Sequence, residues 1–282
     1  MFEITADEEY SWVEFWSERR LQLRTKPETA AAKVALRKAV RSLRARPGHM
    51  LGAVLTSDAR DLVDAENVLL FNVGTGNFAA AAAEGLRFER TYHAPARRGH
   101  QHRYQIVSRC AASELWRRGD TSVVFSGVIP VVSEESKPHE VWLAVRRQVP
   151  TAPRHIGFYG LAVTLTTPFP VKMAAVTKPL LDGIVAGLHA HNGTDLWLVS
   201  ARLAAKLALS TQEVASLLTE PAAGVLGIRT LLRRHGVGIK WNPGDDECVS
   251  CTLLNSVQPH RKQWLLGFEL FAVSEMPPTK VQ

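Results

Sequence analysis

The sequence contains little that would suit a secreted or membrane-bound protein. Its three cysteines, Cys110, Cys248 and Cys251, are too few for a disulfide framework. No apolar run approaches the roughly 18 residues that a membrane span needs. The first residues, MFEITADEEY, are acidic and lack the basic and apolar regions of a signal peptide. We therefore expect a cytoplasmic protein without a membrane partner.

Several catalytic motifs are also missing. The chain has no Gly-x-Ser-x-Gly elbow, no Walker-type loop and no His-Glu-x-x-His helix. The pair Cys248-x-x-Cys251 has no second pair to complete a four-ligand zinc site. Gly74-Thr75-Gly76 follows an apolar segment like a phosphate loop, but no acidic residue lies about twenty positions later, as the dinucleotide fingerprint requires. A tight turn therefore competes with nucleotide binding at these glycines.

The chain is basic and contains enough apolar residues for a core. It has 34 lysines and arginines against 27 acidic residues, a formal net charge of +7 and a pI of about 9.5. Hydrophobic residues make up 46% of its 282 residues. A basic protein of this kind favours an anionic partner, and nucleic acid is the first candidate.

Hydrophobic periodicity predicts an α/β or α+β fold in two parts. The first, residues 1–150, is expected to be helical at its start and then strand-rich; the second, residues 151–282, is expected to be a mixed sheet with packed helices. Helices are predicted at residues 7–25, 28–46, 78–84, 180–190, 196–208, 211–218 and 221–234. Ser210 and Glu213 have the spacing of a capping box at the start of the helix at residues 211–218. Strands are predicted at residues 68–71, 86–92, 102–107, 121–132, 141–148, 158–166, 248–254 and 264–273, with 93–101 as a hairpin loop.

Two acidic segments in the second part can belong to one site. Asp182 is expected to open a helix, and Asp245 and Asp246 precede the strand that begins near Cys248. If that strand lies beside the strand at residues 158–166, the three carboxylates meet at one sheet edge. Such oxygen ligands suit Mg²⁺, which can activate water against a phosphodiester. The alternative is turn chemistry, because Asn242-Pro243-Gly244-Asp245 is typical of a turn.

These two segments resemble the RusA-like Holliday-junction resolvases, whose pattern joins a Lys-Pro-Asp-x-Asp-Asn helix start to a later Asp-Asp before a strand. Residues 178–183 are similar to the first element and residues 244–249 to the second, and the resemblance covers roughly residues 158–275. It implies that Asp182, Asp245 and Asp246 are catalytic metal ligands. It also implies a Mg²⁺-dependent, structure-selective endonuclease that cleaves branched DNA, and a homodimer if that DNA has two-fold symmetry.

The chain departs from the family pattern at three positions in or just after the first element. Leu180 stands where the family has its first aspartate, Gly183 where it has asparagine, and Ala186 where it usually has lysine. Glu247 and Asp195 are candidates for the missing carboxylate.

Basic residues near the acidic segments and in the predicted hairpin loop are candidates for phosphate contacts. They are Lys178, Lys240, Arg233, Arg234, Arg97, Arg98 and Arg103. A solvated surface would use the same residues. The sequence therefore predicts a nucleic-acid-binding protein that leans towards a metal-dependent endonuclease. The alternative is a non-catalytic basic accessory or scaffold protein that binds nucleic acid or a protein partner.

Overall fold

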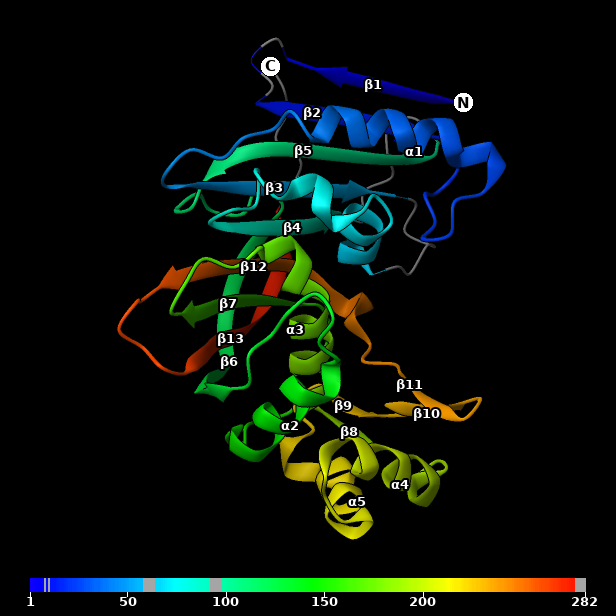
Figure 1. The fold of residues 1–282 in the computed structure, drawn as a ribbon, viewed down its shortest axis with the longest axis vertical. Helices are drawn as coiled ribbons and strands as arrows, with labels where there is room; N and C mark the ends of the chain where they lie inside the picture. Colours follow the sequence, from blue (N-terminus) through cyan, green and yellow to red (C-terminus); the bar gives the residue numbers. More distant parts are fainter. Residues whose placement is uncertain (8, 10, 58–63, 92–97, 277–282) are drawn as a thin grey trace.

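The fold is built on a nine-stranded mixed sheet (Figure 1). The computed structural model describes residues 1–7, 9, 11–57, 64–91 and 98–276. In spatial order the strands are β1 (Phe2–Ala6), β2 (Trp12–Ser17), β5 (His100–Ser108), β3 (His49–Thr56), β4 (Gly85–Thr91), β12 (Cys248–Val257), β7 (Tyr159–Thr167), β13 (Trp264–Glu275) and β6 (Trp116–Ile129). With helices packed on the sheet, this is an α+β fold, as predicted.

Strands from both predicted parts of the chain pair within this one sheet. β4 pairs antiparallel with β12, so the residues before 150 and those after it share a continuous hydrogen-bonded ladder. Two neighbouring pairs are parallel, β3 with β4 and β12 with β7. The division at residue 150, which falls between a helix and β7, stays a prediction.

Different helices cover different parts of the sheet (Figure 1). α1 (Pro27–Val40) contacts β1 and β2, whereas α3 (Met173–Gly187) contacts β4 and β12 and packs on α2 (Pro138–Gln148). These contacts enclose the main hydrophobic core. Among the described residues, no helix is both long and apolar enough to cross a membrane.

A smaller cluster lies at the end of the molecule beyond α2 and α3. It contains α4 (Leu196–Leu207), α5 (Thr211–Thr219), the strand pair β8 (His189–His191) and β9 (Gly227–Arg229), and the hairpin of β10 (Leu232–His235) and β11 (Gly238–Trp241). Its own core includes Trp142, Leu203 and Leu232. The N-cap half of the predicted capping box at the start of α5 is confirmed, because Ser210 Oγ accepts a hydrogen bond from the Glu213 amide.

Five predicted elements are wrong. The helix expected at residues 78–84 does not form, because a 3₁₀ turn at Thr75–Phe78 is followed only by turns up to β4. The helix expected at residues 7–25 contains strand β2, whose residues alternate between partly and fully buried. The strand expected at residues 68–71 is a π-helix, Asn67–Phe71, and the strand expected at residues 141–148 is α2, which begins at Pro138. The helix expected at residues 221–234 is a 3₁₀ turn followed by β9 and β10. A short apolar run fits a strand and a helix equally well. Its conformation depends on which of its faces the rest of the chain buries.

The hairpin predicted from residues 86–92 and 102–107 does not form. Both segments are strands, β4 and β5, but β3 lies between them in the sheet. His93 and Arg97, in the segment between these strands, lie outside the described residues.

Candidate metal centre

Parallel pairing of β12 with β7 brings the two predicted acidic segments together. The pairing runs from Cys248 opposite Tyr159 to Val257 opposite Thr167, which is the neighbour relation that the sequence hypothesis required. Gly244, with φ of 79°, turns the chain into a 3₁₀ turn at Asp245–Glu247, and β12 follows directly. Asp245 is therefore held at the start of a central strand, and it is 6% exposed.

Asp182 reaches the same place from α3. It lies in the middle of this helix, so the prediction that Asp182 opens a helix is wrong. Lys178 lies one turn earlier on the same face, and its Nζ is 3.2 Å from Asp182 Oδ1. Asp245 is near enough to Asp182 to act on the pKa of its carboxyl group, and the charge of Asp182 in turn raises the pKa of Asp245.

Glycines in α3 explain one of the departures from the resolvase pattern. A Cβ added to Gly183 would lie 2.5 Å from Val141 Cβ of α2, and one added to Gly187 would lie 2.6 Å from Val145 Cγ1. The two glycines therefore let α2 and α3 pack closely, and asparagine would not fit at residue 183. Leu180 is fully buried in the main core, so a carboxylate at that position would lose its solvation without a partner.

Two carboxylates that sequence reasoning missed complete the centre. Asp64 and Glu66 precede the π-helix, and with Asp245 they offer oxygen atoms that all lie within 4.8 Å of one another. Lys178 Nζ lies 3.5 Å from Glu66 Oε1. Two acidic residues directly before an apolar run in a basic chain were the available signal. Asp64, Glu66, Asp182 and Asp245, together with Lys178, are called the acidic centre below.

Burial dominates the electrostatics of the acidic centre. It raises the pKa of Glu66 well above its ordinary value, and the Asp245 carboxylate raises it further. Burial, followed by the charge of Asp245, raises the pKa of Asp64 to about 6. Burial also raises the pKa of Asp182 and of Asp245. Burial opposes the charge of Lys178, but the carboxylates of Glu66 and Asp182 outweigh it and raise the pKa of this ammonium group.

The acidic centre therefore contains more negative than positive groups. Four carboxyl groups surround one ammonium group, and no amide, hydroxyl or ammonium donor of a described residue reaches Asp245 Oδ2. A buried acceptor without a donor is costly, and a hard cation would satisfy it. The chemistry of the donor set fits Mg²⁺ better than a softer metal, because every ligand is an oxygen.

Asp246 and the proposed substitutes lie outside this group. Asp246 is half-buried and close enough to His189 to act on the pKa of that imidazole, which burial lowers to about 4. Glu247 is exposed, and Asp195 precedes α4 in a left-handed conformation. Asp64 and Glu66, and not these two residues, join Asp182 and Asp245.

The basic residues near Asp245 lie on an exposed hairpin. In the β10–β11 pair, Arg233 lies directly opposite Lys240, and Arg234 opposite Ile239. Both arginines and Lys240 are exposed, and Figure 1 shows the hairpin projecting from the molecule. Arg202 of α4 anchors its turn by donating to the carbonyls of Gly236 and Gly238, at 3.0 and 2.7 Å. This hairpin, with Arg233, Arg234 and Lys240, is called the basic hairpin below.

The remaining predicted phosphate contacts belong to the other half of the sheet. Arg103 of β5 forms ion pairs with Glu14, at 3.7 Å, and Glu114, at 3.9 Å. Arg98 is exposed beside Trp16 and Glu18. Arg97 lies outside the described residues. The structure thus brings Lys178 into the acidic centre and leaves Arg98 and Arg103 on another part of the surface.

Trp241 and the Gly74–Gly76 segment both have structural roles. Trp241 packs against Trp142 with ring centroids 5.7 Å apart, so it belongs to the smaller core. Gly74, with φ of 106°, precedes a single 3₁₀ turn, and Arg37 of α1 donates to the neighbouring Val73 carbonyl. These glycines thus form a tight turn beneath α1.

Comparisons of the chain with protein-family models, curated proteins and solved structures yield no match. The functional argument therefore depends on the acidic centre and its surroundings.

Proposed function

We propose that this protein is a Mg²⁺-dependent endonuclease that hydrolyses phosphodiester bonds in branched DNA. The observation that carries the proposal is the convergence of Asp64, Glu66, Asp182 and Asp245 around Lys178 from three separate segments of the chain. Turn chemistry alone explains Asp245 but gives no reason for the other carboxylates to lie buried beside it.

Asp64, Glu66, Asp182 and Asp245 would hold Mg²⁺ through their oxygens, and Asp246 would support them from the neighbouring position. A bound Mg²⁺ would polarise a phosphoryl oxygen and lower the pKa of a water molecule. Asp64 is half-buried, whereas the other three acids are buried, so substrate would approach from the Asp64 side. Lys178 holds Glu66 and Asp182 in place and offsets part of their charge.

The basic hairpin supplies the affinity for the DNA backbone. Lys240 is five positions from Asp245, so their Cα atoms are at most about 18 Å apart along the chain. A strand seated on Arg233 and Lys240 would therefore pass within a few nucleotides of the acidic centre. These side chains contact phosphates, which orient the DNA but carry no sequence information.

The test is cleavage of branched and linear DNA by the wild type and by Asp245→Asn, with and without Mg²⁺. We expect cleavage of the branched substrate by the wild type alone, and only with Mg²⁺. Glu247→Gln is the matched control, because it removes an exposed carboxylate from the same 3₁₀ turn. Equal cleavage by the wild type and Asp245→Asn would sink the proposal.

The basic hairpin would also serve a protein that binds nucleic acid without cutting it. In that case the wild type would bind branched DNA with strong salt dependence and show no cleavage with Mg²⁺ or Mn²⁺. A homodimer is expected only if the target has two-fold symmetry, and sedimentation with and without a four-way junction would reveal it.

A further inference from the structure

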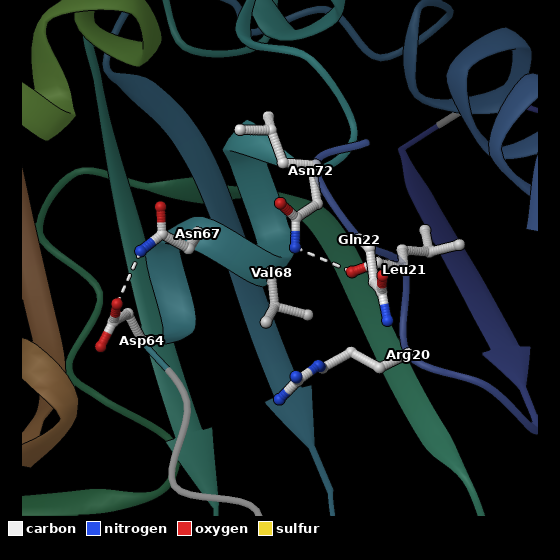
Figure 2. A pocket seen from close by; sticks show the side chains of 8 residues that line it. Arg20, Leu21, Gln22, Asp64, Asn67, Val68 and Asn72 are labelled. Atoms are coloured by element: carbon white, nitrogen blue, oxygen red, sulfur yellow. Dashed lines mark hydrogen bonds between the residues drawn. The ribbon is translucent and has the colours of Figure 1, made fainter. Parts of the chain in front are cut away.

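A pocket with a volume of about 340 Å³ opens beside the acidic centre. Residues 20–23 form one wall and residues between 64 and 72 form the other, and Figure 2 shows these side chains around the hollow. Asp64 belongs both to this pocket and to the acidic centre. Any group in the pocket would therefore lie next to a phosphate held at the centre.

Buried hydrogen bonds hold the wall at residues 20–23 in place. Lys33 of α1 is 2% exposed, and its Nζ donates to the carbonyls of Gln22, at 3.0 Å, and Leu23, at 2.9 Å. Asn72 Nδ2 donates to the Leu21 carbonyl at 2.8 Å, as drawn in Figure 2. These three hydrogen bonds hold the irregular segment at residues 21–23 in place, so this wall of the pocket is preformed.

The opposite wall offers hydrogen-bond acceptors and an apolar surface. Asn67 Nδ2 donates to Asp64 Oδ2 at 2.7 Å, which leaves Asn67 Oδ1 as an acceptor. Asn72 likewise keeps its Oδ1, because its Nδ2 is bonded to the opposite wall. Val68 contributes apolar surface between the two asparagines. An aromatic ring with polar edges fits this combination.

Arg20 adds a positive charge. It is half-buried, and Figure 2 shows its guanidinium group extending from the wall beneath Val68. Among the described residues, no carboxylate forms an ion pair with Arg20. A guanidinium group beside acceptors and apolar surface suits a phosphate attached to a base.

We infer that this pocket binds one unpaired nucleotide of the substrate, with its base between the two walls and its phosphate on Arg20. The inference rests on the proposed function, because it identifies the substrate strand by its position next to the acidic centre. A volume of about 340 Å³ lies at the small end of ligand pockets and leaves no room for a base pair. The nucleotide must therefore be unpaired or leave the stack, which is least costly at a branch point.

The test measures DNA binding in Ca²⁺ by the fluorescence anisotropy of a dye at a duplex end, and the fluorescence of 2-aminopurine reports the surroundings of the base. One probe carries the 2-aminopurine unpaired at a branch point, a second carries it paired, and a third has an abasic site there. The variants are Arg20→Gln and Leu23→Trp, the latter filling the pocket from a side chain that is 68% exposed. Arg24→Gln is the control, because Arg24 is an exposed arginine that does not line the pocket.

We expect Arg20→Gln and Leu23→Trp to weaken binding of the unpaired probe by about tenfold, the size of a lost charged hydrogen bond, and Arg24→Gln to leave it unchanged. Thermal unfolding checks that each variant is folded. Binding of the unpaired probe by either pocket variant at wild-type affinity overturns the inference. Equal affinity for the abasic probe also overturns it, because the pocket would then hold only an anion.

Parallel cleavage assays in Mg²⁺ separate this inference from the proposed function. Cleavage by the wild type that is unaffected by Arg20→Gln and Leu23→Trp overturns the inference alone. Absence of cleavage by the wild type, together with pocket-dependent binding of the unpaired probe, overturns the endonuclease proposal and supports the nucleotide pocket.

Discussion

The acidic centre and the basic hairpin are built in opposite ways, although Asp245 of the centre is only five positions from Lys240 of the hairpin. The hairpin is local, because Arg233 and Lys240 are paired residues within one stretch of eight residues. Both side chains are exposed. The acidic centre joins residues as far apart as Asp64 and Asp245, and most of its groups are buried. An exposed charged side chain is solvated by water and needs no partner. A buried charged side chain must be paired with another charged group or with a ligand.

The largest expected effect is on cleavage by Asp245→Asn. Loss of one ligand removes several kcal/mol of charge stabilisation, so the rate in Mg²⁺ should fall by about 10³-fold. Terbium luminescence should show weaker metal binding in parallel. The comparison breaks if Asp245→Asn binds the metal normally while Glu247→Gln does not.

Removal of the ammonium group should damage stability more than any change in the basic hairpin. In Lys178→Met, Glu66 and Asp182 lose the cation that holds them, and breaking a largely buried pair should lower the free energy of unfolding by about 3 kcal/mol. Mg²⁺ should restore part of this loss. Urea unfolding checks both results, with Lys240→Met as an exposed control that should change stability by less than about 0.5 kcal/mol. A smaller loss in Lys178→Met than in Lys240→Met would contradict the contrast.

The imidazole of His102 tests whether burial also shifts a pKa strongly in another part of the sheet. His102 of β5 is fully buried beside Phe15 and Tyr104, and burial lowers its pKa to about 3. The unfolded chain takes up this proton near pH 6.5, but the folded chain does not. Stability from His102 is therefore present above pH 6.5 and falls by about 1.4 kcal/mol per pH unit as pH drops towards 3.

The measurement is urea unfolding between pH 7.5 and 4.5 for the wild type and His102→Asn. Carboxyls with a raised pKa, such as Asp64, act in the opposite direction in both proteins, so the difference between the two curves isolates His102. Identical slopes would show that this imidazole is protonated in the folded protein.

The smallest expected effect concerns the basic hairpin. Arg233→Gln with Lys240→Gln should weaken DNA binding severalfold and reduce the slope of log K against log[salt] by about 2, one for each lost phosphate contact. Stability should not change. The double variant Arg98→Gln with Arg103→Gln tests in the same way the phosphate contacts that were predicted for these two arginines. An unchanged salt slope for the hairpin variant would exclude it from the DNA interface.

Sequence reasoning succeeded where residues a few positions apart carry the information. The alternation of residues 86–92 and 102–107 predicted β4 and β5, and Ser210 with Glu213 predicted the start of α5. It failed for residues 7–25 and 141–148, where one apolar pattern fits both a strand and a helix. The hydrophobic spacing there does not report which faces the rest of the chain will cover.

For the acidic centre, the residue types in the chain were enough to single out Asp182 and Asp245 and to suggest that their strands are neighbours. Asp64 and Glu66 lie beside them because β3, β4 and β12 are neighbours in the sheet. This strand order places the residues that follow β3 close to α3. No periodic pattern marks such a meeting, since strand order depends on the packing of whole faces. The same packing buried Leu180 in the core, and the other two carboxylates are supplied by Asp64 and Glu66, more than a hundred residues away.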